Sequence, residues 1–150
     1  MCRTFALYMK TSESKYRKCL YFTTNALARK TEKLAQQSWK KVGLSPSHGY
    51  LLFLVLENPG IQPGLVAEHL QLTPSTVTRL IEKLELNKLL VRITEGKISN
   101  LYPTNKAKAL MPRMVECVEE FADNYNQLLG KEEAEKLVQS IGATADKITG

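Results

Sequence analysis

Cysteine is scarce in this sequence, and its spacing argues against two kinds of cross-linked site. The three cysteines, Cys2, Cys19 and Cys117, are odd in number and far apart, and no Cys-x-x-Cys pair occurs. A disulfide framework needs paired cysteines, and a structural zinc site needs clustered ligands. We therefore expect reduced thiols, no metal and no other cofactor.

Long hydrophobic runs are also missing. The longest, Tyr50 to Leu56, is far shorter than the roughly 18 residues that a membrane-spanning helix needs. The first residues lack the apolar segment and cleavage site of a secretory signal. We expect a soluble, cytoplasmic protein with no membrane partner.

Catalytic motifs are equally absent from the sequence. It contains no Gly-x-Ser-x-Gly elbow, no glycine-rich phosphate loop and no histidine paired by motif with a nucleophile. The sequence therefore predicts a binding protein and not an enzyme.

Positive charge is present, but it is concentrated at one end of the chain. The net charge is +6, and residues 1–45 carry ten Lys or Arg against two Glu. Residues 46–104 balance five basic against five acidic residues, and residues 105–150 carry six against eight. Charge alone therefore gives only a modest preference for an anionic partner such as nucleic acid.

Glycine and proline divide the first half of the chain into helices. Neither residue occurs before Gly43, which favours one long helix over roughly residues 14–40. Ser45-Pro46 and Thr73-Pro74 each combine a capping side chain with proline at the first helical position. They predict helices over 46–57 and 74–87, with a short helix opened by Pro63 between them.

In the second half of the chain, the spacing of apolar residues changes from a helical pattern to a strand pattern. Two short strands, 90–94 and 98–103, flank the turn Glu95-Gly96-Lys97. Thr104 then caps a long helix to Leu129, and a last helix follows Gly130. On that last helix we expect five apolar residues to face inward: Ala134, Leu137, Val138, Ile141 and Ile148.

This order of elements predicts a mainly α fold with a small β-hairpin wing. Residues 43–104 would form a winged helix-turn-helix, the DNA-binding domain. Residues 1–42 and 105–150 would form a helical dimerisation region, because their apolar stripes exceed what one small lobe can bury.

The helix over residues 74–87 has two chemically distinct faces. Its apolar face contains Val77, Leu80, Ile81 and Leu84. Its polar face can enter the major groove, which is wide enough for one helix, and Arg79 can reach a guanine edge there. The candidate DNA-binding residues on helix and hairpin are Ser75, Thr76, Thr78, Arg79, Lys83, Arg92 and Lys97.

The stretch from Leu65 to Glu85, LVAEHLQLTPSTVTRLIEKLE, resembles the MarR family of bacterial regulators. The wing pair Glu95 and Lys97 stands where that family carries an acidic and a basic residue at the tip of its wing. The family usually has glycine where Lys88 stands, and a longer wing with Asp and Arg.

The resemblance implies a transcription regulator, in most cases a repressor, that binds duplex DNA as a homodimer. The two copies would read a palindromic site through the helix 74–87 and the wing 90–103. A small-molecule effector or an oxidant releases the DNA in many such proteins.

Several alternatives stay open at this point. The scaffold could serve as a protein-interaction module without sequence-specific DNA binding, because fold does not dictate function. Cys19 is a candidate redox residue, although its apolar neighbours in the expected helix favour a packing role. His48 and His69 lack the clustered partners of a metal site, and the basic residues of the first helix form a solvated face that would add long-range attraction to DNA.

Overall fold

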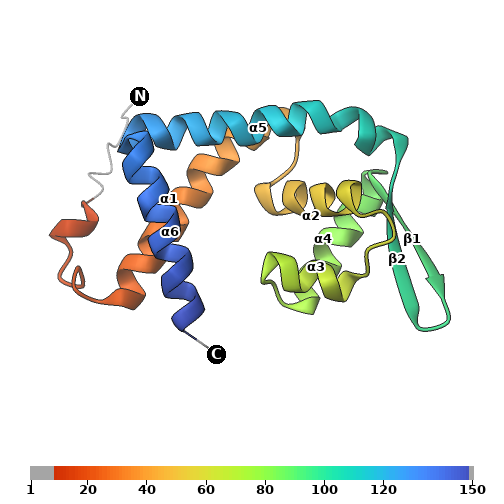
Figure 1. The fold of residues 1–150 in the computed structure, drawn as a ribbon, viewed down its shortest axis with the longest axis horizontal. Coiled ribbons are helices and arrows are strands. Elements are labelled where there is room, and N and C mark those ends of the chain that lie inside the picture. Colours follow the sequence, from red (N-terminus) through yellow and green to blue (C-terminus); the bar gives the residue numbers. More distant parts are fainter. Residues whose placement is uncertain (1–8, 149–150) are drawn as a thin grey trace, which may run out of the picture.

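The computed structural model describes residues 9–148, which form two lobes joined by one long helix (Figure 1). No helix in this part of the chain is long and apolar enough to cross a membrane. The elements, in chain order, are η1 (Thr11–Glu13), α1 (Leu20–Trp39), η2 (Lys40–Val42), α2 (Pro46–Glu57), α3 (Pro63–Leu70), α4 (Pro74–Leu86), β1 (Leu90–Glu95), β2 (Ile98–Pro103), α5 (Asn105–Leu129) and α6 (Lys131–Lys147).

Three helices begin where the capping residues predict. The side chains of Ser45, Thr73 and Thr104 each accept a hydrogen bond from a backbone N–H of the first turn of α2, α4 and α5. Such caps satisfy a donor that the helix itself leaves free. Mainly helical architecture with a two-stranded hairpin is thus confirmed.

The first helix starts later than its pattern predicts. The Ser14 hydroxyl accepts a hydrogen bond from Tyr16 N–H (3.2 Å), and its carbonyl accepts one from Arg17 N–H (3.1 Å). Local side-chain bonds of this kind compete with helix formation, and α1 begins only at Leu20.

Cys19 is therefore the N-cap of α1 and not a residue within it. Its side chain makes no capping bond and is exposed. The expected packing role for Cys19 was wrong, because the helical register that would have buried it does not extend that far toward the N-terminus.

The core lies beneath α2 and connects both lobes. Its largest fully buried side chain is Trp39, at the end of α1, and the buried set continues through α2, α4, the hairpin and α5. Gly49 of α2 lies directly against the Trp39 ring, where a Cβ atom would overlap ring carbons. This contact lets α1 and α2 approach more closely than a larger residue would allow.

The hairpin is a regular antiparallel pair. Leu90 faces Pro103 at its base, and Glu95 faces Ile98 next to the turn. Gly96 occupies the first turn position with a φ of 61°, a conformation that favours glycine in two-residue turns. Ile61 adds a single bridge to Leu101, which ties the hairpin to the loop before α3.

Two helix ends adopt the left-handed conformation without glycine. Gln71 (φ 51°) ends α3 and Lys88 (φ 58°) follows α4. After α4, Lys88 N–H donates to Glu85 O (2.9 Å) and Leu89 N–H donates to Leu84 O (2.9 Å). This is the Schellman arrangement, in which glycine is the usual left-handed residue.

The lobe built from α1, α6 and one end of α5 (Figure 1) carries many exposed apolar side chains. Of the five residues expected to face inward on α6, only Ala134 is buried. The other four are exposed in the single chain, and one of them, Ile148, follows the end of α6. The exposed large apolar side chains of this lobe are Leu20, Tyr21, Leu27, Leu128, Leu129, Leu137, Val138, Ile141 and Ile148.

Candidate nucleic-acid interface

Helix α4 separates its apolar and polar side chains as its sequence predicts. Val77, Leu80, Ile81 and Leu84 are buried against α2, α3 and the hairpin. The polar residues predicted on the opposite face are all exposed: Ser75, Thr76, Thr78, Arg79 and Lys83. The helix thus presents a continuous polar surface of a width that fits the major groove.

Hydroxyl groups cluster at the N-terminus of α4. Thr73 Oγ1 lies 2.9 Å from Thr76 Oγ1 and 3.2 Å from Ser75 Oγ, and it accepts a bond from Thr76 N–H at 3.4 Å. The Thr78 hydroxyl donates to the Pro74 carbonyl at 3.0 Å. The positive end of the α4 helix dipole favours an anion such as a DNA phosphate at this end of the helix.

Thr73 was missed as a site residue by sequence reasoning, which named it only as a cap. The signal was present, because a capping hydroxyl followed by hydroxyls at the second and third helical positions places three polar groups around one helix end. Thr73 is exposed and belongs to the same surface as Ser75 and Thr76.

The wing extends away from α4 and ends in a single exposed basic residue. Lys97 stands in the two-residue turn, and Glu95 is the last residue of β1. Among the residues that the structure describes, neither side chain takes part in a salt bridge. Lys97 is therefore free to contact a phosphate.

Arg92 is placed differently from the other predicted contacts. Its guanidinium forms a salt bridge of 3.0 Å with Glu85 of α4, and both side chains are about one third exposed. The pair joins β1 of the wing to α4. Direct DNA contact by Arg92 stays a prediction, since that guanidinium already has a partner within the chain.

The segment that carries this geometry matches a known family. Residues 42–97, which include α2, α3, α4, β1 and the wing turn, match the model of the MarR family. This segment of the chain is therefore similar to the MarR family. The resemblance noted in the stretch from Leu65 to Glu85 is therefore confirmed, and the family is one of transcriptional regulators.

One relative of this chain is YybA of Bacillus subtilis (strain 168), described as an uncharacterized HTH-type transcriptional regulator. The two sequences are 29% identical over 89 residues, which make up 57% of this chain and 59% of YybA. The matched segment thus spans less than two thirds of that relative's length.

Solved structures share the fold over nearly the whole chain. The transcriptional repressor CouR bound to a 23-mer DNA duplex superposes with a TM-score of 0.79 and 21% identity, over 91% of this chain and 98% of CouR. CouR bound to p-coumaroyl-CoA gives 0.81 and 21%, over 93% and 100%. At these identities the likeness shows the winged-helix fold alone.

Neither His48 nor His69 lies in a metal-binding cluster. Within residues 9–148, no group of three His, Cys, Asp or Glu side chains could hold a metal ion. His48 instead forms a hydrogen-bonded pair with Ser45 at the start of α2. Burial lowers the pKa of His48, and the nearby charge of Lys83 lowers it further.

The two cysteines in the described part of the chain differ in environment. Cys117 of α5 is buried, its thiol donates to the Arg113 carbonyl at 3.2 Å, and burial raises its pKa. A raised pKa disfavours the reactive thiolate. Cys19 is exposed, and redox sensing by it stays a hypothesis. Cys2 lies outside the described residues.

Proposed function

We propose that this chain is a sequence-specific DNA-binding transcription regulator that reads the major groove through α4 and contacts the backbone through the wing. The observation that carries the proposal is the exposed polar face of α4, with Arg79 at its centre and the hydroxyl cluster around Thr73 at its N-terminus. Arg79 is long enough to form a bidentate contact with guanine. Ser75 and Thr76 lie where a phosphate meets the helix end.

We further propose that the regulator acts as a homodimer. The uncovered apolar side chains of α1, α5 and α6 form a surface that a lone chain would leave in water. A second copy buries this surface symmetrically and places two α4 helices on one palindromic site. In this arrangement residues 1–42 and 105–150 dimerise and residues 43–104 bind DNA.

The regulator is proposed to repress, with a small-molecule effector that shifts the two reading heads. CouR has been solved both with DNA and with p-coumaroyl-CoA, which supports a repressor of this fold that also takes a ligand. The proposed role needs no catalytic step, and we infer that the chain is not an enzyme.

The test is selection of bound sequences from random duplex DNA, followed by titrations of the selected duplex and a scrambled duplex at several salt concentrations. We expect enrichment of a palindrome. Arg79 is assigned to a base, so Lys83 and Lys97 are the two exposed cations of this surface that remain for phosphate. Four such contacts in a dimer predict a slope of log affinity against log salt of about −4.

Sedimentation of the free protein completes this test. A folded monomer at micromolar concentration would contradict the dimer, and binding with no sequence enrichment would contradict the reading function. Absence of any duplex binding at low salt would favour the remaining candidate, a protein-interaction module built on the same scaffold.

A further inference from the structure

The outward face of α4 has a narrow centre, whose direction is set by the residues buried beneath the helix. Successive helical residues are rotated by about 100°. Four buried side chains define the direction that points into the core: Val77, Leu80, Ile81 and Leu84. Four exposed residues lie within about 30° of the opposite direction: Ser75, Arg79, Glu82 and Leu86. The centre of the outward face thus contains a single carboxylate, that of Glu82.

Three of the residues predicted to contact DNA lie at the sides of this face. Thr76, Thr78 and Lys83 are exposed but are rotated by about 70–90° from its centre. When a helix lies in the major groove, its centre faces the base edges and its sides face the two phosphate backbones. Glu82 is therefore better placed for a base than these three residues are.

Glu82 is accessible and has no charge partner within the described part of the chain. Its side chain is exposed, and within residues 9–148 it forms no salt bridge with Arg79, Lys83 or any other residue. Glu85, the other exposed or half-buried carboxylate near the end of α4, is in contrast bonded to Arg92. An unpaired carboxylate that enters an anionic groove weakens binding to every sequence, unless a base supplies a hydrogen-bond donor.

The chemistry of a carboxylate leaves one matching base in the major groove. An ionised carboxylate accepts hydrogen bonds and donates none. Guanine and thymine present acceptors to this groove, and adenine presents an acceptor beside its amino donor. Cytosine presents its N4 amino donor without an acceptor. Cytosine is therefore the base that fits an unpaired carboxylate.

We propose that Glu82 is a specificity-determining residue, which accepts a hydrogen bond from cytosine N4 beside the guanine that Arg79 contacts. The inference rests on the proposed reading of DNA by α4. Residues three apart are separated by about 4.5 Å along a helix axis, which is close to the rise of roughly 3.4 Å between base pairs. Arg79 and Glu82 thus meet adjacent base pairs, and each half-site contains two neighbouring G·C pairs.

Selection from random duplex DNA with the wild type and with Glu82→Gln tests this inference through a change of base. A glutamine amide both donates and accepts, and it pairs with adenine N6 and N7. At one position beside a guanine in each half-site, we expect cytosine with the wild type and adenine with Glu82→Gln.

Titrations of the selected palindrome with cytosine or adenine at that position measure the size of the effect. The wild type should favour cytosine by about fivefold per half-site, the lower end for one base contact, because cytosine offers a single donor. Glu82→Gln should favour adenine. These titrations compare duplexes of equal length and charge, so the phosphate contribution to affinity cancels.

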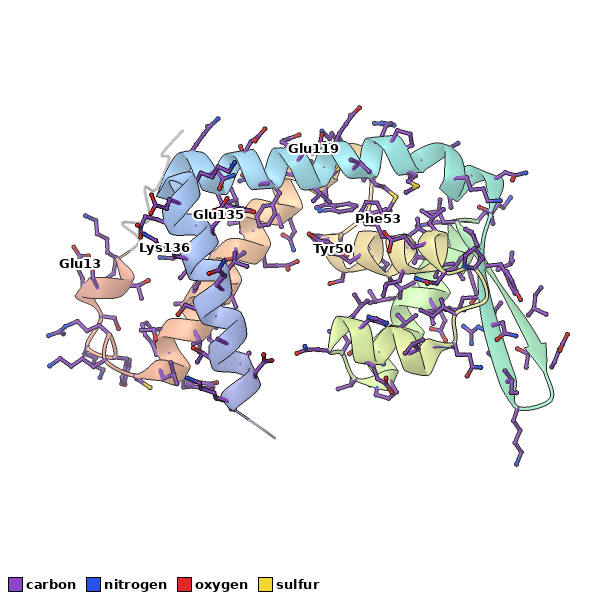
Figure 2. All side chains as sticks on the ribbon, viewed as in Figure 1. Glu13, Tyr50, Phe53, Glu119, Glu135 and Lys136 are labelled. Atoms are coloured by element: carbon purple, nitrogen blue, oxygen red, sulfur yellow. The ribbon has the colours of Figure 1, made fainter. Side chains whose placement is uncertain are left out.

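Two further variants provide the controls. Glu119→Gln makes the same substitution at an exposed carboxylate of α5, outside residues 43–104 (Figure 2), and should leave the selected base unchanged at every position. Arg79→Ala should relax the neighbouring guanine and retain the cytosine. Glu82, Arg79 and Glu119 are all exposed, so thermal unfolding of each variant should match the wild type.

The outcomes separate this inference from the proposed function. If the wild type enriches no palindrome, both fail. If a palindrome is enriched and Arg79→Ala relaxes one position, but Glu82→Gln selects the same site as the wild type, then α4 reads DNA and the role of Glu82 is refuted. Equal strengthening of selected and scrambled duplexes by Glu82→Gln, with no change of base, would also refute it, because the carboxylate would then only repel phosphates.

Discussion

Replacing Gly49 with alanine tests the contact that joins the two lobes. An added Cβ would overlap Cζ3 and Cη2 of Trp39 and lie 2.8 Å from Cε3. Trp39 is completely buried, so its ring has no solvent-filled space to move into. The substitution therefore forces either the ring or helix α2 to shift.

The expected magnitude follows from two opposed effects. Overpacking a core costs about 1–3 kcal/mol, and full burial of Trp39 places this site at the upper end. Alanine is favoured over glycine in a helix interior by about 1 kcal/mol. The net loss should be about 1–2 kcal/mol, which lowers the Tm of a chain of this length by roughly 2–8 °C.

Gly142→Ala provides the matched control. Gly142 lies within α6, and a Cβ there would meet no atom within 4 Å. This variant gains the helix preference without the clash and should be more stable than wild type by about 1 kcal/mol. Replacing glycine with alanine is thus expected to lower stability at position 49 and to raise it at position 142.

The assay is urea unfolding followed by far-ultraviolet circular dichroism, which does not depend on tryptophan. A double-mutant cycle uses Trp39→Leu, which removes the overlapped ring atoms. In that background Gly49→Ala should be neutral or stabilising, with a coupling of at least about 1 kcal/mol. An equal loss in both backgrounds, or no loss in the wild type, would refute the steric argument.

Three further predictions concern DNA reading, backbone strain and pH. Arg79→Ala should reduce the binding free energy on a selected palindrome by about 1–3 kcal/mol per half-site. Lys97→Ala should instead weaken binding to selected and scrambled duplexes alike and reduce the salt dependence of binding. If Arg79→Ala weakened binding to both duplexes equally, Arg79 would be a phosphate contact and not a base contact. Lys88→Gly should raise the free energy of unfolding by about 0.5–1 kcal/mol. The left-handed conformation costs a non-glycine residue about 1–2 kcal/mol, and the greater chain entropy of glycine offsets about half of that gain. Urea unfolding measures the change, and Lys88→Ala should show no gain. Because burial lowers the folded-state pKa of His48, the unfolded chain takes up the proton first, so stability should fall as pH drops from about 6.5 toward the lowered pKa. His48→Gln should flatten that part of the pH profile, and an unchanged profile would contradict the assignment.

Residues close in sequence determined most of the secondary structure. Capping hydroxyls followed by proline define the starts of α2 and α4, because both the cap bond and the fixed proline φ act within a few residues. The two faces of α4 follow from helical period alone. The wing turn follows from Gly96, since glycine adopts positive φ without a steric cost.

Other features depend on atoms that only tertiary structure brings together. The bond between Arg92 and Glu85 requires β1 to fold back beside α4, and no spacing rule distinguishes it from an arginine free to bind DNA. The start of α1 depends on the Ser14 hydroxyl and carbonyl, whose hydrogen bonds to Tyr16 N–H and Arg17 N–H compete with helix formation. The spacing of apolar residues does not predict these bonds. Sequence alone therefore predicted α4 and its two faces but assigned Cys19 to the wrong environment.

The sequence by itself thus determined which segments are helices, where α4 lies and which of its residues face outward, because these properties depend on neighbours within one or two turns. Tertiary structure alone decided the approach of Gly49 to Trp39 and the exposure of the α6 apolar face. Each of these depends on the distance between elements far apart in the chain, which packing of the whole core sets.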